Sequence, residues 1–208
     1  MAVVNAYITF DELDSYLAAA NNGQTVGTAN RRTEMENAIN AASRMIDKHC
    51  GRIFYDAGAA ARVFTTDNGV VVNVPQDFHT LTSLKTDSTG DGTFDTTWAA
   101  GDYQLEPLNG VRDGESGWPS NRLVAVGTKS FPAGLEARIQ VTATWGWAAT
   151  PADVKQACYI QAHRIFTRAE APTGVIGVGE FGAIRLTSVD RDVETILNPY
   201  RRVAGMFI

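Results

Sequence analysis

The chain has few cysteines and no long apolar run. Its two cysteines among 208 residues, Cys50 and Cys158, lie far apart in the sequence and outside any C-x-x-C pair. Two isolated cysteines do not form a disulfide framework, so we expect free thiols and a reducing compartment. No apolar stretch approaches the ~20 residues that cross a membrane, so we expect no membrane partner. The opening residues, MAVVNAYITFDEL, lack a basic region and soon reach acidic residues, so we expect no signal peptide and an intracellular site of synthesis.

Positive charge is also scarce. The chain has 18 Lys and Arg against 23 Asp and Glu, which gives a formal net charge of -5. Free-standing, non-specific DNA binding needs clustered Lys and Arg that displace counterions, so this balance argues against it. The hydrophobic content of 44% and the charged content of 20% are ordinary for a soluble globular protein. The length suits one domain, or one domain with a large insertion.

Motifs for catalysis and metal binding are sparse. The three histidines, His49, His79 and His163, lack the spacing of zinc ligands. No nucleophile elbow or similar signature sets Ser or Cys beside a histidine and an acid. We therefore predict no catalytic residue, no metal site and no cofactor. His49 lies on the apolar face of a predicted helix, which is typical of a core or interface histidine.

The segment Gly177–Gly182 matches G-x-G-x-x-G letter for letter. A dinucleotide-binding fingerprint follows a strand and opens a helix, so that phosphate meets helix-terminal amides. This segment instead follows a predicted helix and Pro172, and it precedes a β-like Ala-Ile-Arg-Leu run. Glu180 also puts a carboxylate where the phosphates would lie. We interpret the segment as a mobile loop or as a loop that a partner orders.

The segment Asp87–Asp95 resembles a calcium-binding loop. It has acids at the first, fifth and ninth positions and glycine at the sixth, but its third position is Thr89. Its twelfth position, which normally supplies a bidentate glutamate, is Trp98. We interpret the segment as a polar hairpin tip, with a calcium site as the alternative.

Helical signals begin near the N-terminus. The T-x-x-E pattern of Thr9 and Glu12 is a capping box, which predicts a short amphipathic helix over 9–20. Residues 28–50 repeat apolar residues every three or four positions, with Gly51 where a left-handed cap is expected. The predicted apolar face of this longer helix is Met35, Ala38, Ile39, Ala42, Met45, Ile46 and His49, and its predicted polar side is Arg32, Glu36, Asn40, Ser43, Arg44 and Asp47.

Two more helices are predicted towards the end of the chain. Thr150 is the predicted N-cap of a helix over 151–170, with proline at its first position. Asp190 is the predicted N-cap of a last helix, which Pro199 ends. The segment between these helices contains Gly174, Gly177, Gly179 and Gly182 and a candidate strand at Ala183–Ser188, and the last helix is followed by Arg201-Arg202 and the apolar Met206-Phe207-Ile208.

Between the helical segments, short β-type runs alternate with Gly, Pro, Asp and Asn. The alternation of Arg138–Trp145 predicts a strand in a sheet with one solvent-facing side. The four tryptophans have no interleaved Lys and Arg, so we interpret them as core and interface anchors rather than base-stacking platforms. We predict five or six short strands, at Ala61–Thr65, Val70–Val74, Leu81–Thr86, Tyr103–Glu106, Leu123–Val126 and Arg138–Trp145.

Several motifs follow one another in order towards the end of the chain. They are Gly146-Trp147, Pro151-x-Asp153-Val154-x-x-Ala157, Arg164-x-x-x-Arg168, Pro172-x-Gly174-Val175 and Asp190-x-Asp192-Val193-x-x-Ile196-Leu197-x-Pro199-Tyr200-Arg201. The TFDELDSYL and ASRMIDKHCGRIF stretches precede them near the start. Together these motifs resemble the head-to-tail connector proteins of tailed bacteriophages, the adaptor or head-completion family. The similarity covers most of the chain, loosely in the β-rich part.

This resemblance implies a structural virion protein without catalytic activity. It implies a ring of twelve copies that binds beneath the portal protein, extends the DNA channel and docks the next connector, stopper or tail-terminator protein. DNA would pass through the channel without sequence-specific binding. The protein would be assembled in the host cytoplasm and lie in the neck of the virion. The alternatives are another ring-forming tail or capsid accessory protein, a calcium-binding β-domain protein, or a hydrolase.

The sequence therefore predicts an α+β protein. We expect a small helical bundle from residues 1–51 and 146–208, with a β-rich insertion domain at 52–145. We expect the 173–188 loop and the 199–208 tail to contact neighbouring copies or the portal. The alternative for the two arginines is that they only cap the last helix. The expected contact residues are Phe181, Tyr200, Arg201, Arg202, Phe207 and Ile208.

Overall fold

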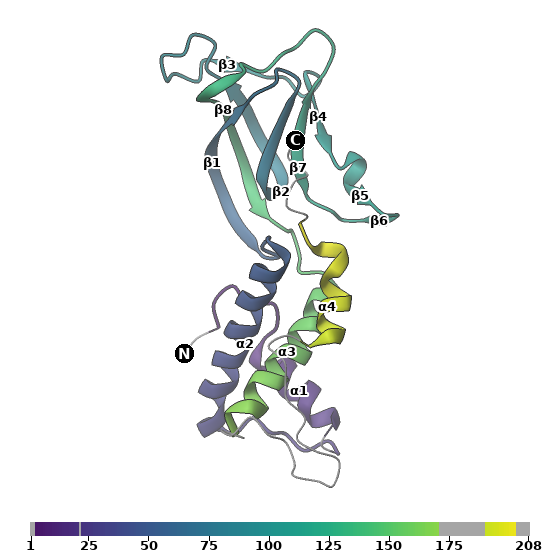
Figure 1. Cartoon of the computed structure of the whole chain (residues 1–208). Helices are drawn as coiled ribbons and strands as arrows, with labels where there is room; N and C mark the ends of the chain where they lie inside the picture. The colour runs from purple at the N-terminus through teal and green to yellow at the C-terminus, as the bar shows by residue number, and fades with distance from the viewer. Residues whose placement is uncertain (1–2, 21, 171–189, 203–208) are drawn as a thin grey trace. The chain divides into compact units, whose positions relative to one another are not determined.

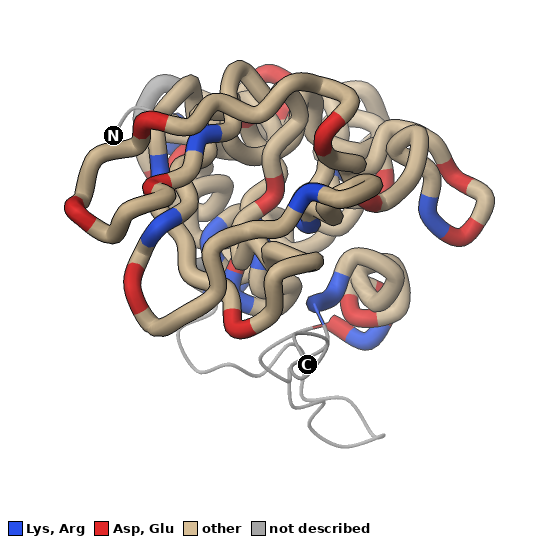
Figure 2. The backbone as a smooth tube through the Cα atoms, turned by 90° about the horizontal axis from the view of Figure 1, so that it is seen from above, with Lys and Arg blue, Asp and Glu red and all other residues tan. Residues whose placement is uncertain are grey.

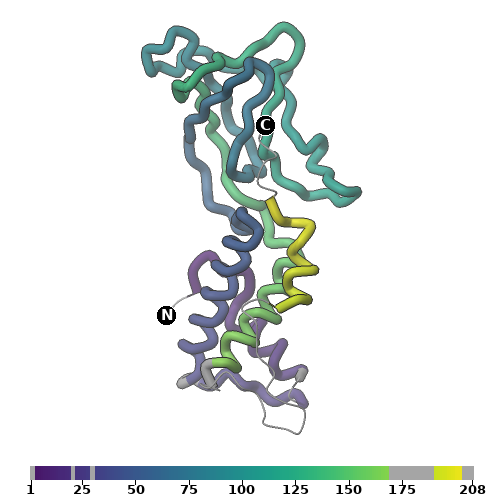
Figure 3. Tube along the Cα trace, viewed as in Figure 1, coloured from purple at the N-terminus to yellow at the C-terminus, as the bar shows by residue number. Residues whose placement is uncertain are grey.

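A computed structural model describes residues 3–20, 22–170 and 190–202 of the chain. These residues contain four α-helices and a mainly antiparallel sheet, which confirms the predicted α+β class (Figure 1). They form two compact units. The helical unit comprises Met1–Phe54 and Thr150–Val203, and the β unit comprises Tyr55–Ala149. The chain therefore leaves the helical unit after its second helix and returns to it after the last strand (Figure 3). No helix of the described residues has the length and apolarity needed to cross a membrane.

The helical unit packs its helices through small and aliphatic side chains. The helix α2 lies against α3, and α4 lies against α3 (Figure 1). The helices are α1 (Phe10–Ala20), α2 (Ala29–Cys50), α3 (Ala152–Glu170) and α4 (Arg191–Leu197), and the short 3-10 helix η2 (Asn198–Tyr200) follows α4. Their buried apolar residues include Leu13, Leu17, Met35, Ala38, Ile39, Ala42, Ile46, Val154, Ala157, Cys158, Ala162, Val193 and Leu197.

The helix ends follow the local sequence signals. The Thr9 N–H donates to the Glu12 carboxylate at 2.7 Å, and the Glu12 N–H donates to the Thr9 hydroxyl at 3.2 Å. This reciprocal pair confirms the predicted capping box. Gly51 ends α2 in the left-handed region, with φ 65°, and its N–H donates to the Asp47 carbonyl. Asp190 caps α4 by accepting a hydrogen bond from the Asp192 N–H at 2.9 Å.

Two local predictions for the helices are wrong. The sequence places Ser43 on the polar side of α2, but this residue is fully buried. Its hydroxyl donates to the Ile39 carbonyl at 2.9 Å and accepts the Tyr7 N–H at 3.2 Å, because the segment before α1 covers that side of α2. The helix α3 begins at Ala152, and the hydroxyl of its predicted cap, Thr150, donates to the Phe54 carbonyl.

The β unit contains one large sheet with the strand order β1-β8-β2-β7-β4, in which β3 also pairs with β2. All pairings in this sheet are antiparallel. The strands β5 and β6 form a separate two-stranded ribbon. The elements are β1 (Asp56–Thr66), β2 (Val71–Thr86), β3 (Thr96–Thr97), β4 (Tyr103–Glu106), η1 (Leu108–Gly110), β5 (Val111–Arg112), β6 (Glu115–Ser116), β7 (Ser120–Ala125) and β8 (Gly134–Gly146).

The prediction of short strands is wrong for the centre of this sheet. Two predicted strands, Val70–Val74 without its first residue and Leu81–Thr86, are parts of the single 16-residue strand β2. Pro75 favoured a break because proline cannot donate a hydrogen bond to a neighbouring strand. It is accommodated because the pairing of β2 with β7 shifts register between Asn73 and Phe78. The short strands β3, β5 and β6 were not predicted.

The core of the β unit lies on one face of the sheet. Along β8, every second residue from Ile139 to Trp145 is buried, which confirms the predicted alternation. Trp145 is fully buried, and its indole N–H donates to the Ala60 carbonyl at 2.8 Å. Trp98 stacks on Phe131 with ring centroids 4.3 Å apart. All four tryptophans are at most 8% exposed, so they serve as anchors of the β unit.

Candidate interface on the helical unit

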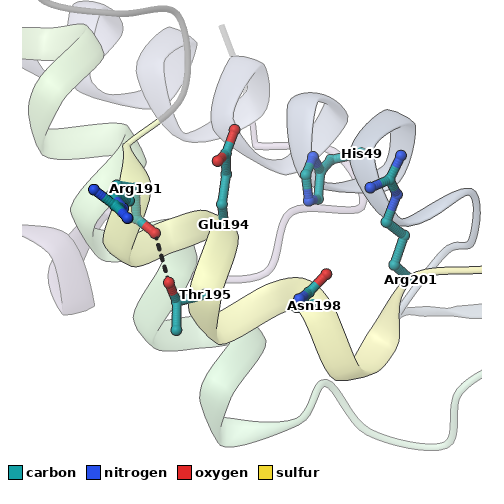
Figure 4. Close-up of a pocket in the computed structure, with 6 residues that line it drawn as sticks. All are labelled: His49, Arg191, Glu194, Thr195, Asn198 and Arg201. Atoms are coloured by element: carbon teal, nitrogen blue, oxygen red, sulfur yellow. Dashed lines mark hydrogen bonds between the residues drawn. The ribbon is translucent and has the colours of Figure 1, made fainter.

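A polar groove of about 270 Å³ lies on the surface of the helical unit, between the C-terminal half of α2 and the α4–η2 segment (Figure 4). Two arginines and one glutamate give it an excess of positive charge. His49 also borders an apolar contact of α2, α3 and α4. The groove is lined by His49, Arg191, Glu194, Thr195, Asn198 and Arg201.

The sequence spacing of α4 and η2 builds one wall of this groove. Positions 191, 194, 195, 198 and 201 recur every three or four residues, so their side chains project from one side. The opposite side contributes Val193 and Leu197, which are 1% exposed, to the core. An ion pair of 2.7 Å joins Arg164 on α3 to the capping residue Asp190. The polar wall is therefore held by burial behind it and by a charged contact at its start.

The arginines after α4 have different surroundings. The Arg201 side chain is exposed and lies in the groove, while its N–H donates to the Asn198 carbonyl at 3.2 Å. The Arg202 N–H donates to the Cys50 carbonyl at 2.8 Å, so it satisfies a free carbonyl at the end of α2. The N–H groups of Arg201 and Arg202 thus satisfy carbonyls at the ends of two helices, η2 and α2. The sequence indicated only the last helix for these two residues.

Tyr200 lies inside the helical unit. It is 5% exposed, its ring meets the Phe54 ring edge-on at 5.7 Å, and its hydroxyl lies 3.3 Å from the Asp153 carboxylate. It anchors the α4–η2 segment within the helical unit, and almost none of its side chain is exposed. Of the other predicted contact residues that the structure describes, Arg201 is exposed and Arg202 is half-buried.

Other predicted contact residues lie outside the described residues. These are Phe181, Phe207 and Ile208, together with the 173–188 loop, its G-x-G-x-x-G motif and the candidate strand Ala183–Ser188. Sequence reasoning missed Arg191, Glu194, Thr195 and Asn198 as groove residues. The signal that could have identified them is the three- or four-residue spacing that ends at Arg201.

The two thiols are chemically quiet in this fold. Both are buried and free. Burial raises the pKa of Cys50 to about 12, and burial likewise raises the pKa of Cys158 to about 12. A thiol is a nucleophile only as its thiolate, so neither residue has the properties of a reactive cysteine at neutral pH.

The predicted hairpin tip at Asp87 is organised by its own backbone. The Asp87 carboxylate accepts hydrogen bonds from the N–H groups of Thr89, Gly90 and Gly92, at 3.0, 2.6 and 2.8 Å. Burial raises the pKa of this carboxyl, but these hydrogen bonds outweigh that effect and the pKa is lowered. In the part of the chain that the structure describes, no group of three or more His, Cys, Asp or Glu side chains is placed to hold a metal ion.

Comparisons with known proteins show similarity in structure. No protein-family model matches the chain, and no curated protein matches it. The chain resembles one in the "Neck of empty GTA particle computed with C6 symmetry", at 20% identity and a TM-score of 0.58, over 100% of this chain and 97% of that chain. A chain in the "Neck of native GTA particle computed with C12 symmetry" gives 21% identity and a TM-score of 0.55, over 100% and 97%.

A third similar chain belongs to the "Virion of native gene transfer agent (GTA) particle". It has 20% identity and a TM-score of 0.58, and the match covers 99% of this chain and 95% of that chain. These matches include both the helical unit and the β unit. They show that the chain shares the whole fold of proteins found in the neck of such particles.

Proposed function

We propose that this chain is a structural protein of a virion neck. As a head-to-tail adaptor it forms a ring of twelve copies beneath the portal protein, extends the DNA channel and docks the next connector, stopper or tail-terminator protein. It is assembled in the host cytoplasm. The observation that carries the proposal is the similarity to neck proteins over the full length of the chain. The bacteriophage-connector motifs of the sequence support the same place in a particle.

In this proposal the two parts of the chain have different tasks. Residues 1–51 and 146–208 form the connector core, and residues 52–145 form an insertion domain that faces capsid or the next ring. The candidate contacts belong to the core. They are the groove with Arg201, the neighbouring Arg202, and the segments that contain Phe181, Phe207 and Ile208.

The net negative charge of the chain lies in its β unit. Between residues 55 and 149 the chain has 6 Lys and Arg against 11 Asp and Glu, which accounts for its whole net charge of -5. Figure 2 marks these acidic and basic positions along the backbone. A surface of this balance attracts phosphate weakly, because retention of DNA depends on clustered basic side chains.

The proposal is tested by deleting the gene in the producing host and imaging the particles. An adaptor is required to join heads to tails, so we expect filled heads and separate tails. Heads that still carry tails would overturn the proposal. Shortened tails or unstable capsids on joined particles would instead favour a tail or capsid accessory protein.

The role of the groove is tested by complementing the deletion with Arg201→Glu. Reversing the charge in the groove should reduce the number of joined particles at least tenfold, as expected for loss of a charged interface contact of about 1.4 kcal/mol or more. The matched control is Lys48→Glu, which makes the same charge change at an exposed position of α2 outside the groove lining. Equal effects of the two variants would remove the groove from the interface.

A further inference from the structure

The sheet of the β unit has two open edges that differ in length. The strand β1 forms one edge with 11 residues, and β4 forms the other with four. Figure 1 shows them on opposite sides of the sheet. A strand at a sheet edge presents unpaired N–H and C=O groups, so each edge is a template for another strand.

The middle of the β1 edge lacks the features that normally protect an edge strand. Its residues 57–61 are Ala, Gly, Ala, Ala and Ala, and all five are exposed. It contains no proline, and its register shifts occur near its ends, between Asp56 and Gly58 and between Phe64 and Thr66. The one arginine in the strand, Arg62, lies with its guanidinium 4.1 Å from the centre of the Trp145 ring, so its charge is held against the sheet. Residues 59–61 therefore form an uncharged stretch of edge with regular pairing to β8, beyond the irregularity at Asp56 and Gly58.

The opposite edge suits this stretch in charge and direction. Residues 103–105 of β4 are Tyr, Gln and Leu, so they bring no charge against the alanine-rich stretch of β1. The one acid of each strand, Asp56 in β1 and Glu106 in β4, lies at the start of β1 and at the end of β4. Two copies of this acidic unit repel each other over much of their surface, and neutral edges are where they can meet most easily. Four antiparallel steps separate β1 from β4, so the two edge strands run in the same direction.

We propose that β1 of one copy pairs with β4 of the next copy, which joins the β units of neighbouring subunits into one continuous sheet. The contact joins two different edges, so it is head-to-tail and closes into a ring when the rotation between copies allows it. If that rotation axis runs along the strands, the new pair is parallel. This inference rests on the proposed ring, and it adds the backbone surface through which the β units associate.

Cysteine cross-linking in assembled particles tests the pairing. Ala61→Cys places a thiol on the exposed β1 edge, and Gln104→Cys places one on β4. Within one copy these strands are about 19 Å apart, since four interstrand spacings of roughly 4.8 Å separate them. A bismaleimide too short for that distance cannot link them within one chain. The native thiols, Cys50 and Cys158, are buried and do not compete.

The double variant should give a ladder of covalent multimers in purified particles, with most of the chain shifted out of the monomer band. Each single variant should stay monomeric. Particles that contain the chain but give no ladder would overturn the pairing and leave the neck assignment intact. Dimers from Ala61→Cys alone would show a β1–β1 contact and also overturn it. Absence of the chain from the particles would defeat the proposed function itself.

A pair of substitutions provides a second measurement that does not depend on cross-linking. Val63 lies in β1 and is 49% exposed, while Val70 lies in the turn between β1 and β2 and is 55% exposed. Val63→Lys introduces a charge on the edge strand and should lower the yield of joined particles at least tenfold. Val70→Lys should leave it within twofold of wild type. Equal yields from the two variants would contradict the pairing.

Discussion

Gly146 is the position where one added methyl group should have the largest effect on the β unit. It ends β8 with φ 91°, a backbone conformation that L side chains rarely adopt. A Cβ atom at this position would lie 2.0 Å from the carbonyl oxygen of Tyr55. That oxygen belongs to the backbone just before β1 and accepts the Trp147 N–H, so it cannot move without disturbing the start of the sheet.

Gly146→Ala therefore has two costs. The left-handed conformation costs about 1–2 kcal/mol for a residue with a Cβ atom. The collision with the Tyr55 carbonyl forces a backbone shift, for which overpacking in proteins suggests about 1–3 kcal/mol more. We expect a loss of roughly 2–5 kcal/mol in the free energy of unfolding of the β unit.

Gly117→Ala is the matched control. Gly117 has the same φ of 91°, but a Cβ atom added there would have no described atom within 4 Å beyond its chain neighbours. It should show only the conformational cost of about 1–2 kcal/mol. Urea denaturation followed by tryptophan fluorescence measures both variants, because all four tryptophans belong to the β unit. A difference below about 0.5 kcal/mol between the variants would refute the steric argument.

Three further outcomes follow from the helical unit. Asp190→Ala removes both the N-cap of α4 and the ion pair with Arg164, and should lower stability by at least about 1 kcal/mol in thermal denaturation followed by circular dichroism; no change would show that both contacts are dispensable. The backbone N–H of Thr9 donates to the Glu12 carboxylate and lowers the pKa of that carboxyl. The ionised Glu12 therefore stabilises the folded state above the unfolded pKa of about 4.3, and this stabilisation is lost as pH falls through the lower folded pKa. Wild type should therefore lose more stability than Glu12→Gln in urea titrations taken from about pH 5 down to about pH 3, and parallel losses would contradict this. Cys50 and Cys158 should react with a thiol reagent at neutral pH only after denaturation, and labelling of the folded chain at the rate of a free thiol would show that the helical core opens.

The helix signals of the sequence were reliable where a few neighbouring residues decide the structure. The capping box of Thr9 and Glu12, the left-handed Gly51 and the N-cap Asp190 all form as predicted. Each depends on a hydrogen bond or a backbone conformation within about one helical turn, so the sequence contains the necessary information. The alternation of β8 was predictable for the same reason, since one buried face imposes a period of two.

The candidate interface was only partly visible in the sequence. Arg201 was named from the sequence as a residue of the tail after the last helix, and Arg201 lines the groove. The other groove residues were not predicted, although their spacing puts them on the same side of α4. Nothing local distinguishes a polar stripe that borders a groove from a stripe that faces solvent, because the opposite wall comes from α2, well over a hundred residues earlier in the chain.

The sequence by itself determined the positions of the helices, most of their ends and the existence of most strands. Only the tertiary structure decided that β2 continues through Pro75, that Ser43 is buried and that Tyr200 is an internal anchor. It also decided that the Arg202 N–H closes the end of α2. These features depend on which distant segments lie against each other. Local periodicity shows which side of a helix or strand is apolar enough to be buried. Packing between segments remote in the sequence decides which segment covers that side.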